Sequence, residues 1–123
     1  MIDNKTNIEA LVNKYPDLFS KHPRNIHFPA GWNSLVETLS AIIQNELNEL
    51  PLEVKSSIFV LQVKSKFGGL RYYMNECTPQ MQGAISMAES LSLQICEKCS
   101  SYSAQAYVNN GWRVTLCTQC HNL

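Results

Sequence analysis

The sequence has no excess of charge of either sign. Its 123 residues include ten Lys and Arg and ten Asp and Glu, so the formal net charge is zero. A strong nonspecific grip on DNA or RNA needs clustered basic residues over the phosphates, and this balance argues against one. The charges are unevenly spread, because residues 1–50 hold six acidic and four basic side chains. This small bias would suit a basic partner, but it is also typical of an ordinary solvated surface.

Long apolar runs are missing as well. No stretch of the chain is long enough to span a bilayer, so we expect no membrane partner. The segment Met1–Lys5 has no apolar region behind it and no signal-type cleavage site. With most cysteines in metal-ligand spacing rather than in a disulfide framework, these absences predict a protein of the reducing cytoplasm.

The sequence also lacks a phosphate-binding loop, a Ser/His/Asp set and a pair of carboxylates in catalytic spacing, so we predict that it is not an enzyme. His22 and His27 lie in an irregular stretch with no Cys or carboxylate nearby in sequence. A catalytic site would have to assemble one of them with Cys77 and Glu76 from distant parts of the chain. We expect Cys77 to be a small buried side chain instead.

Four of the five cysteines form the clearest motif. Cys96 and Cys99 make one Cys-x-x-Cys pair, and Cys117 and Cys120 make another after seventeen residues. This spacing is typical of a four-thiolate zinc site. We therefore predict one structural zinc held by Cys96, Cys99, Cys117 and Cys120, with two disulfides or four reduced thiols as the alternatives. His121 could replace Cys117 or Cys120 as a ligand.

The residues between the two pairs are typical of a β-hairpin. Residues 104–108 and 112–116 are strand-like, and Asn110-Gly111 between them is a strong two-residue turn signal. Such a hairpin would bring the second cysteine pair beside the first and complete a zinc ribbon. We expect Trp112 to pack on this hairpin.

The preceding residues predict an α+β domain. Apolar residues recur with helical spacing over 6–14, 32–50 and 78–95, while 17–19 forms a short turn, 20–31 is irregular and 51–57 is a loop. Thr78-Pro79 is a strong helix start. The helix over 32–50 has one broad apolar face, which predicts the centre of the core. The alternative is an interaction helix that docks in a groove of a partner.

Two strands, 58–66 and 70–75, are predicted to pair through a turn at Phe67-Gly68-Gly69. Strict alternation places Val60 and Val63 on opposite faces of the first strand. The pairing would gather Lys64, Lys66 and Arg71 near the turn, where this basic and aromatic cluster could meet a phosphate or an acidic partner. The alternative is a solvated hairpin tip with its Tyr and Phe in the core.

Together these elements predict an α+β fold in which helices pack on a small antiparallel hairpin, followed by a C-terminal zinc ribbon. We expect a core domain over 1–95 and a zinc-ribbon module over 96–123. The final helix runs almost directly into Cys96, without a Gly/Ser-rich tether. The module is therefore predicted to be rigidly joined to the core.

The order of these landmarks resembles a family of small bacterial and prophage-type proteins. The shared landmarks are Gly31-Trp32, the run Gln62–Tyr73 around Lys-Phe-Gly-Gly-Leu-Arg, the pair Cys96–Cys99, and Gly111-Trp112 with Thr115–Cys117. The resemblance implies a small α+β domain that ends in a zinc ribbon, and it implies no enzymatic activity. Members tend to have glycine just after the first cysteine pair, where this chain has Ser100-Ser101.

Two functions are expected from this evidence. Small proteins of this kind also resemble immunity partners of bacterial toxins, which favours a protein-binding inhibitor that covers the active site of a toxin with acidic and aromatic residues. The alternative is a nucleic-acid-binding or regulatory protein of phage origin. In that case Lys64, Lys66, Arg71, Lys98 and Arg113 would contact phosphates.

Overall fold

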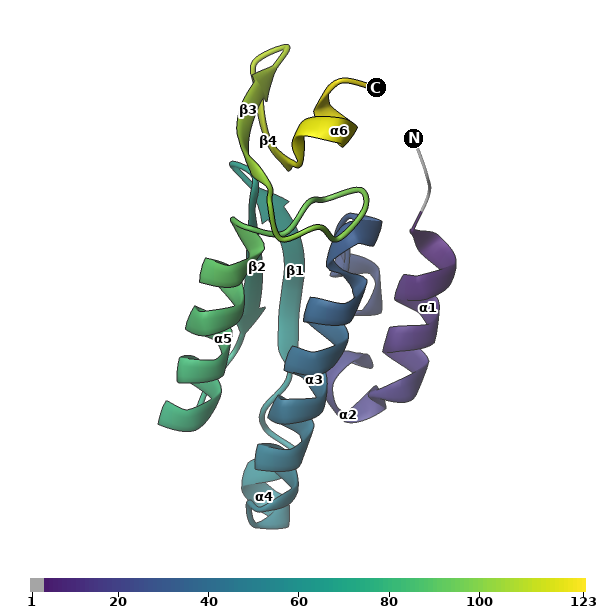
Figure 1. Ribbon diagram of the computed structural model, residues 1–123. Coiled ribbons are helices and arrows are strands. Elements are labelled where there is room, and N and C mark those ends of the chain that lie inside the picture. The colour runs from purple at the N-terminus through teal and green to yellow at the C-terminus, as the bar shows by residue number, and fades with distance from the viewer. Residues whose placement is uncertain (1–3) are drawn as a thin grey trace.

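The computed structural model describes residues 4–123 and shows helices packed with two separate two-stranded antiparallel sheets (Figure 1). This confirms the predicted α+β fold class. The helices are α1 (Lys5–Lys14), α2 (Pro16–Phe19), α3 (Asn33–Asn48), α4 (Leu52–Lys55), α5 (Pro79–Ser92) and α6 (Thr118–His121), with 3-10 turns η1 (Pro23–Asn25) and η2 (Ala30–Trp32). The strands are β1 (Val60–Lys66), β2 (Gly69–Met74), β3 (Gln105–Asn109) and β4 (Trp112–Leu116).

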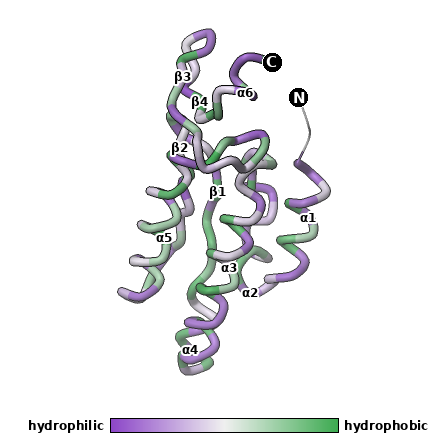
Figure 2. The backbone as a smooth tube through the Cα atoms, in the orientation of Figure 1, coloured by the Kyte–Doolittle hydropathy of each residue, from purple (hydrophilic) through white to green (hydrophobic). Residues whose placement is uncertain are grey.

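The core lies between α3 and the first sheet, as the apolar face of α3 predicts. Val36, Leu39, Ile43 and Leu47 of α3 are buried, and α3 also packs against α5. The sheet contributes its apolar beginning to this core. Figure 2 shows that β1 is apolar where it starts and polar where it approaches the turn into β2. The α3 face is therefore used within the chain and is not available to a partner's groove.

The free edge of β1 is covered by the segment that the sequence predicted to be irregular. Ile26 forms a parallel bridge to Val63, and the backbone N–H of His27 donates to the Val63 carbonyl at 2.9 Å. The Asn25 side chain donates to the carbonyl of Leu61 at 3.2 Å. These bonds satisfy backbone groups that an open edge strand would offer to other chains.

The free edge of β2 is covered by side chains of α5. The N–H of Leu70 donates to Ser92 Oγ at 2.9 Å, and the N–H of Tyr72 donates to Glu89 Oε2 at 3.0 Å. The ring of Tyr72 is buried, and its hydroxyl lies 2.9 Å from Ser40 Oγ of α3. Helix α5 thus completes the hydrogen bonding of a sheet that has only two strands.

One strand prediction is wrong because β1 does not alternate strictly. The pairing of β1 with β2 shifts register between Val60 and Gln62, which is a β-bulge. A bulge inserts one residue without a cross-strand partner, so later side chains change face. Val60 and Val63 are consequently both fully buried, while Leu61 is partly exposed. The expected loop over 51–57 is also partly wrong, since it contains the short helix α4.

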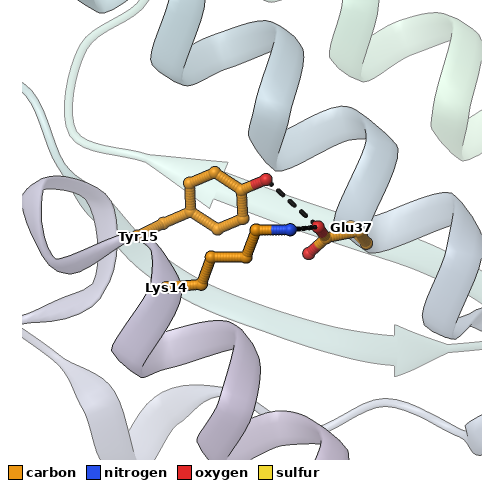
Figure 3. Close-up of polar contacts among 3 residues, drawn as sticks. All are labelled: Lys14, Tyr15 and Glu37. Atoms are coloured by element: carbon orange, nitrogen blue, oxygen red, sulfur yellow. Dashed lines mark hydrogen bonds and ion pairs between the residues drawn. The ribbon is translucent and has the colours of Figure 1, made fainter.

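The carboxylate of Glu37 on α3 makes two of the contacts that attach the N-terminal helices to α3 (Figure 3). Lys14 Nζ forms an ion pair with Glu37 Oε1 at 2.5 Å, and the Tyr15 hydroxyl donates to the same oxygen at 3.1 Å. Burial, with the help of this hydrogen bond, raises the pKa of Tyr15.

Within residues 4–123, none of the helices combines the length and apolar character that a bilayer crossing requires.

Candidate metal centre

The four predicted cysteine ligands come together in space. The Sγ atoms of Cys96, Cys99, Cys117 and Cys120 all lie within 4.8 Å of one another, and Cys99 Sγ is 3.6 Å from Cys117 Sγ. A tetrahedral ion with metal–sulfur distances of about 2.3 Å separates its sulfurs by about 3.8 Å. These cysteines are therefore close enough to hold one metal ion. Across residues 4–123 they are the one such group of His, Cys, Asp and Glu side chains.

The first cysteine pair lies in a tight turn that ends at Ser100. The N–H of Ser100 donates to the Cys96 carbonyl at 3.1 Å, and Ser100 has φ +71°. That left-handed conformation favours glycine, which is the residue that the resemblance noted from the sequence leads us to expect just after this pair. Here the serine side chain compensates, because Ser100 Oγ donates to the Gly31 carbonyl at 2.7 Å. The serine in place of the expected glycine thus keeps the turn and adds a contact to the core.

The second pair is positioned by the predicted hairpin. Strands β3 and β4 pair antiparallel from Gln105 opposite Leu116 to Asn109 opposite Trp112. Between them Asn110 and Gly111 both have positive φ, +53° and +83°, as a type I′ turn requires.

The hairpin leads into α6, whose first turn forms around the second cysteine pair. Cys117 Sγ accepts the N–H of Cys120 at 3.4 Å. The spacing, the turn signal and the strand lengths of the sequence therefore account for how the two pairs meet.

Gly31 allows the core to touch the first cysteine pair. Its N–H donates to the Glu97 carbonyl at 2.8 Å, and a Cβ placed on it would lie 2.0 Å from the carbonyl oxygen of Cys96. The next residue, Trp32, is fully buried, and its indole N–H donates to the Ile95 carbonyl at 3.0 Å. The Gly31-Trp32 landmark is thus a direct contact between the core and the metal centre.

A second contact joins the metal centre to the turn between β1 and β2. The N–H of Glu97 donates to the Thr115 carbonyl at 2.9 Å, and the Glu97 carboxylate accepts the N–H of Thr115. Thr115 Oγ1 donates to the Gly68 carbonyl at 2.6 Å. Burial raises the pKa of Glu97. Gly68 therefore takes part in holding the ribbon, which gives the Phe-Gly-Gly landmark a structural role.

The crowded thiols perturb one another's ionisation. Burial raises the pKa of Cys96, but backbone N–H groups of Cys117, Cys99 and Lys98 outweigh it and lower this pKa to about 6. A hydrogen bond to the Cys117 thiol raises the pKa of Cys120 to about 12. One thiolate is thus stabilised while the proton on another is retained. A bound cation would allow all four sulfurs to be thiolates together.

The predicted basic cluster lies at the same end of the molecule. Lys64 is directly opposite Arg71 across the strands, and Lys66 is opposite Gly69. Arg71 is partly engaged, because its Nη1 donates to the Leu70 carbonyl at 3.0 Å. Lys66 Nζ lies 5.7 Å from the centre of the Phe67 ring. The three cations are therefore neighbours, and none of them forms an ion pair with a residue of 4–123.

Other candidate residues are not brought into one site. Cys77 is exposed, so the expectation that it is buried is wrong: it lies in the connection between β2 and α5, beyond the last buried strand residue. His22 contacts the ring of Phe59, with centroids 5.8 Å apart. His121 stacks on Tyr107 at 3.6 Å and is not part of the metal-binding group.

Two aromatic residues differ from the sequence prediction. Trp112 does not pack on the hairpin, since its side chain is 77% exposed, and Phe67 is 68% exposed instead of lying in the core. Periodicity could not show this, because the pattern of a short strand or a two-residue turn does not reveal which of its apolar side chains stay exposed.

Comparison of the chain with protein-family models, with curated proteins and with solved structures found no match.

Proposed function

We propose that this protein is a non-enzymatic inhibitor that binds and neutralises a protein partner, in the manner of a toxin immunity protein, and that one structural zinc supports its fold. The proposal of a zinc ion is supported by the four sulfur ligands. Four cysteine sulfurs are the usual ligands of structural zinc, and they leave no coordination position for water or substrate. A centre of this kind stabilises the fold and performs no reaction.

The observation that favours a protein partner is an acidic and apolar surface at the end of the molecule opposite the metal centre. Figure 1 shows α4 at one end and β3 and β4 at the other. We call this surface the acidic corner; it is formed at the end of α3 and on α4 by Ile42, Glu46, Glu49, Leu52, Glu53 and Val54. No Lys or Arg occurs between Arg24 and Lys55 in the sequence, and Lys55, at the end of α4, forms an ion pair with Asp17.

The acidic corner exposes apolar side chains that the fold does not use. Leu52 is 76% exposed, and Ile42 and Val54 are exposed as well. Glu46 follows Ile42 by four residues and Glu49 by seven, so these three share one face of the helix. Within residues 4–123, the three glutamates of the corner form no ion pair. Apolar groups surrounded by unpaired charge of one sign are typical of a surface that meets a complementary, here basic, partner.

Such a surface suits an inhibitor of an enzyme whose active site is basic, for example one that acts on phosphate-containing substrates. Charge complementarity would accelerate association, and the exposed aliphatic side chains would supply the desolvated centre of the interface. The cytoplasmic location expected from the sequence agrees with a protein that protects the cell that makes it.

Co-expression with a toxin tests this proposal. Reading frames next to the gene for this chain are the candidates, and each would be expressed with and without this protein while growth is measured. We expect restored growth with one of them and a complex that survives gel filtration. A variant with Glu46, Glu49 and Glu53 changed to Gln should lose protection, while the matched variant Glu9→Gln on α1 should keep it. Protection that is unaffected by the triple change would refute the acidic corner as the binding surface.

A further inference from the structure

The metal end of the molecule contains a cleft between its two hairpins. One wall is the end of β1 with its turn, and the other is the tip of the β3–β4 hairpin; Figure 1 shows the two hairpins meeting at this end. The cleft has a volume of about 560 Å³ and is lined chiefly by Lys64, Lys66, Phe67, Val108, Trp112 and Arg113. The hydrogen bond from Thr115 Oγ1 to the Gly68 carbonyl joins the two walls just below. The cleft is therefore preformed, and little ordering would be needed for a ligand to bind.

Two aromatic rings of the cleft contribute little to the fold. Phe67 and Trp112 are both more than two thirds exposed, whereas the other tryptophan, Trp32, is fully buried. Phe67 also has φ +54°, a left-handed backbone conformation that is strained for a bulky side chain. The two-residue turn between Lys66 and Gly69 requires this conformation, but it does not require an aromatic side chain, and the exposed ring adds little buried area to the fold. Strain of this kind is found at functional sites, where the surroundings hold a residue in place for a ligand.

The charges of the cleft all have one sign. Lys64, Lys66 and Arg113 line it, no acidic residue does, and none of the three forms an ion pair within residues 4–123. The lining of this cleft is thus basic although the whole chain is neutral, and three of the ten acidic residues lie at the acidic corner. Aromatic faces beside unpaired cations are complementary to stacked bases and phosphates.

A second, larger cleft of about 860 Å³ lies beside the first, between the metal centre and the start of α1. Lys64 and Ser65 line both, and Lys98 and His27 line the second. Glu97 is its acidic residue, and the carboxylate of Glu97 is already bonded to the N–H of Thr115. With Lys64 and Lys98 lining the second cleft and Lys64, Lys66 and Arg113 lining the first, two neighbouring basic clefts fit an extended anionic chain better than a small molecule.

We propose that this cleft binds single-stranded nucleic acid, with bases stacked on Trp112 and Phe67 and phosphates held by Lys64, Lys66 and Arg113. A duplex is a poor fit because its bases are already stacked on one another and cannot reach the two rings. An acidic protein would satisfy the cations but would not need two exposed ring faces. The proposal concerns the end opposite the acidic corner, so it can be tested independently of the inhibitor function.

Binding of short oligonucleotides tests the proposal. Fluorescein-labelled U10, dT10 and a ten-base-pair duplex would be titrated with the zinc-loaded protein at several salt concentrations. We expect both single strands to bind more tightly than the duplex, with quenching of the exposed Trp112 emission and weaker binding at higher salt. RNA and DNA are separate arms, and a preference for either identifies the natural strand. Failure of both single strands to bind at low salt would overturn the proposal.

Matched variants distinguish stacking of bases on the aromatic rings from nonspecific electrostatic attraction. Trp112→Ala should weaken binding about 5- to 150-fold, the effect expected for loss of one stacked base. Tyr102→Ala, which removes another exposed ring outside the cleft, should leave binding unchanged. Lys66→Gln should lower the slope of log affinity against log salt by about 0.7, and Lys21→Gln should not. Each changes an exposed residue, and zinc content and circular dichroism would verify folding.

An arm with polyglutamate tests the competing partner. If polyglutamate binds as tightly as U10 and the binding depends equally on Trp112, the cleft recognises an acidic protein and the proposal is wrong. If Trp112→Ala and Tyr102→Ala behave alike towards U10, the rings do not stack on bases and the proposal is also wrong.

Discussion

Gly31 is the residue on which the contact between core and metal centre depends most closely. A methyl group at this position would overlap the carbonyl oxygen of Cys96. The nearest atoms belong to the backbone of Cys96 and Glu97, so no side chain can rotate away to make room. Gly83 in α5 offers a comparison, because a Cβ there would meet nothing within 4 Å. We therefore expect substitution by alanine to destabilise the protein at Gly31 and to stabilise it at Gly83.

Gly31→Ala should lower the free energy of unfolding by about 3 kcal/mol, since the loop and the cysteine turn must separate to accept the methyl group. Gly83→Ala should raise it by about 0.5 kcal/mol, because alanine restricts the unfolded chain and favours the helix. Urea unfolding of both zinc-loaded variants would measure the difference. Equal effects would show that Gly31 is not confined by the cysteine turn.

Tyr72 should make stability depend on pH in alkaline solution. Burial raises the pKa of its hydroxyl well above the usual value of about 10, although a hydrogen bond from Ser40 opposes the shift. The folded state therefore keeps a proton that the unfolded chain loses. The stability contributed by neutral Tyr72 is complete below pH 10 and declines as the pH rises through the range between the unfolded and folded pKa values.

The measurement is urea unfolding from pH 8 to pH 11 for the wild type and Tyr72→Phe. Their difference at pH 8 reports the lost contact with Ser40. By pH 11 the wild type should have lost about 1.4 kcal/mol relative to the variant, because one pH unit above the unfolded pKa corresponds to that energy. Parallel curves over the whole range would contradict a buried neutral Tyr72.

Secondary structure was predictable where local signals are strong. Thr78-Pro79 starts α5, with the Thr78 hydroxyl accepting the N–H of Met81 at 3.2 Å, and Asn110-Gly111 forms the turn between β3 and β4. The bulge in β1 and the helix α4 were missed. Neither has a local signature, because the bulge is set by pairing with β2, and α4 is held to α2 by the ion pair of Lys55 with Asp17.

At the scale of elements, the β3–β4 hairpin should depend on the metal more than the helical core does. Buried side chains form two separate clusters, one around α3 and a small one around Cys96, Leu116 and Cys117. The small cluster buries little apolar surface, so metal binding must supply much of its stability.

Removal of the metal with a strong chelator should therefore abolish amide-exchange protection over 105–116 and preserve it over 36–47. Hydrogen exchange followed by mass spectrometry would show this division, with the chelator-free protein as control. Equal loss of protection in both regions would mean that the core and the ribbon unfold as one unit. Unchanged protection would mean that the ribbon needs no metal.

At the scale of the whole molecule, acidic and basic residues are equal in number, but the fold places groups of each at opposite ends. Glu46, Glu49 and Glu53 gather at one end, and Lys64, Lys66 and Arg113 at the other. The basic cluster near the first hairpin was predictable from strand pairing. Arg113 was grouped with these cations as a possible phosphate contact, but the position of Trp112 beside them could not be predicted from sequence, because it depends on contacts between the two hairpins such as that of Thr115 with Gly68.

The candidate metal centre was predictable almost completely, because a Cys-x-x-Cys turn fixes two sulfurs locally and a hairpin of known length brings the second pair. The contacts that attach it to the core were not, since Gly31 and Cys96 are sixty-five positions apart and no pattern links them. Exposure of Cys77 was missed for the same reason: burial of a single small residue depends on how distant elements pack.

Zinc stoichiometry tests the central claim most directly. Protein purified under reducing conditions without chelator would be analysed for metal by mass spectrometry, together with Cys99→Ser and the matched variant Cys77→Ser. We expect one zinc per chain in the wild type and in Cys77→Ser, and loss of that zinc in Cys99→Ser. A metal-free wild type, or a full equivalent of zinc retained by Cys99→Ser, would contradict a structural centre built from these four cysteines.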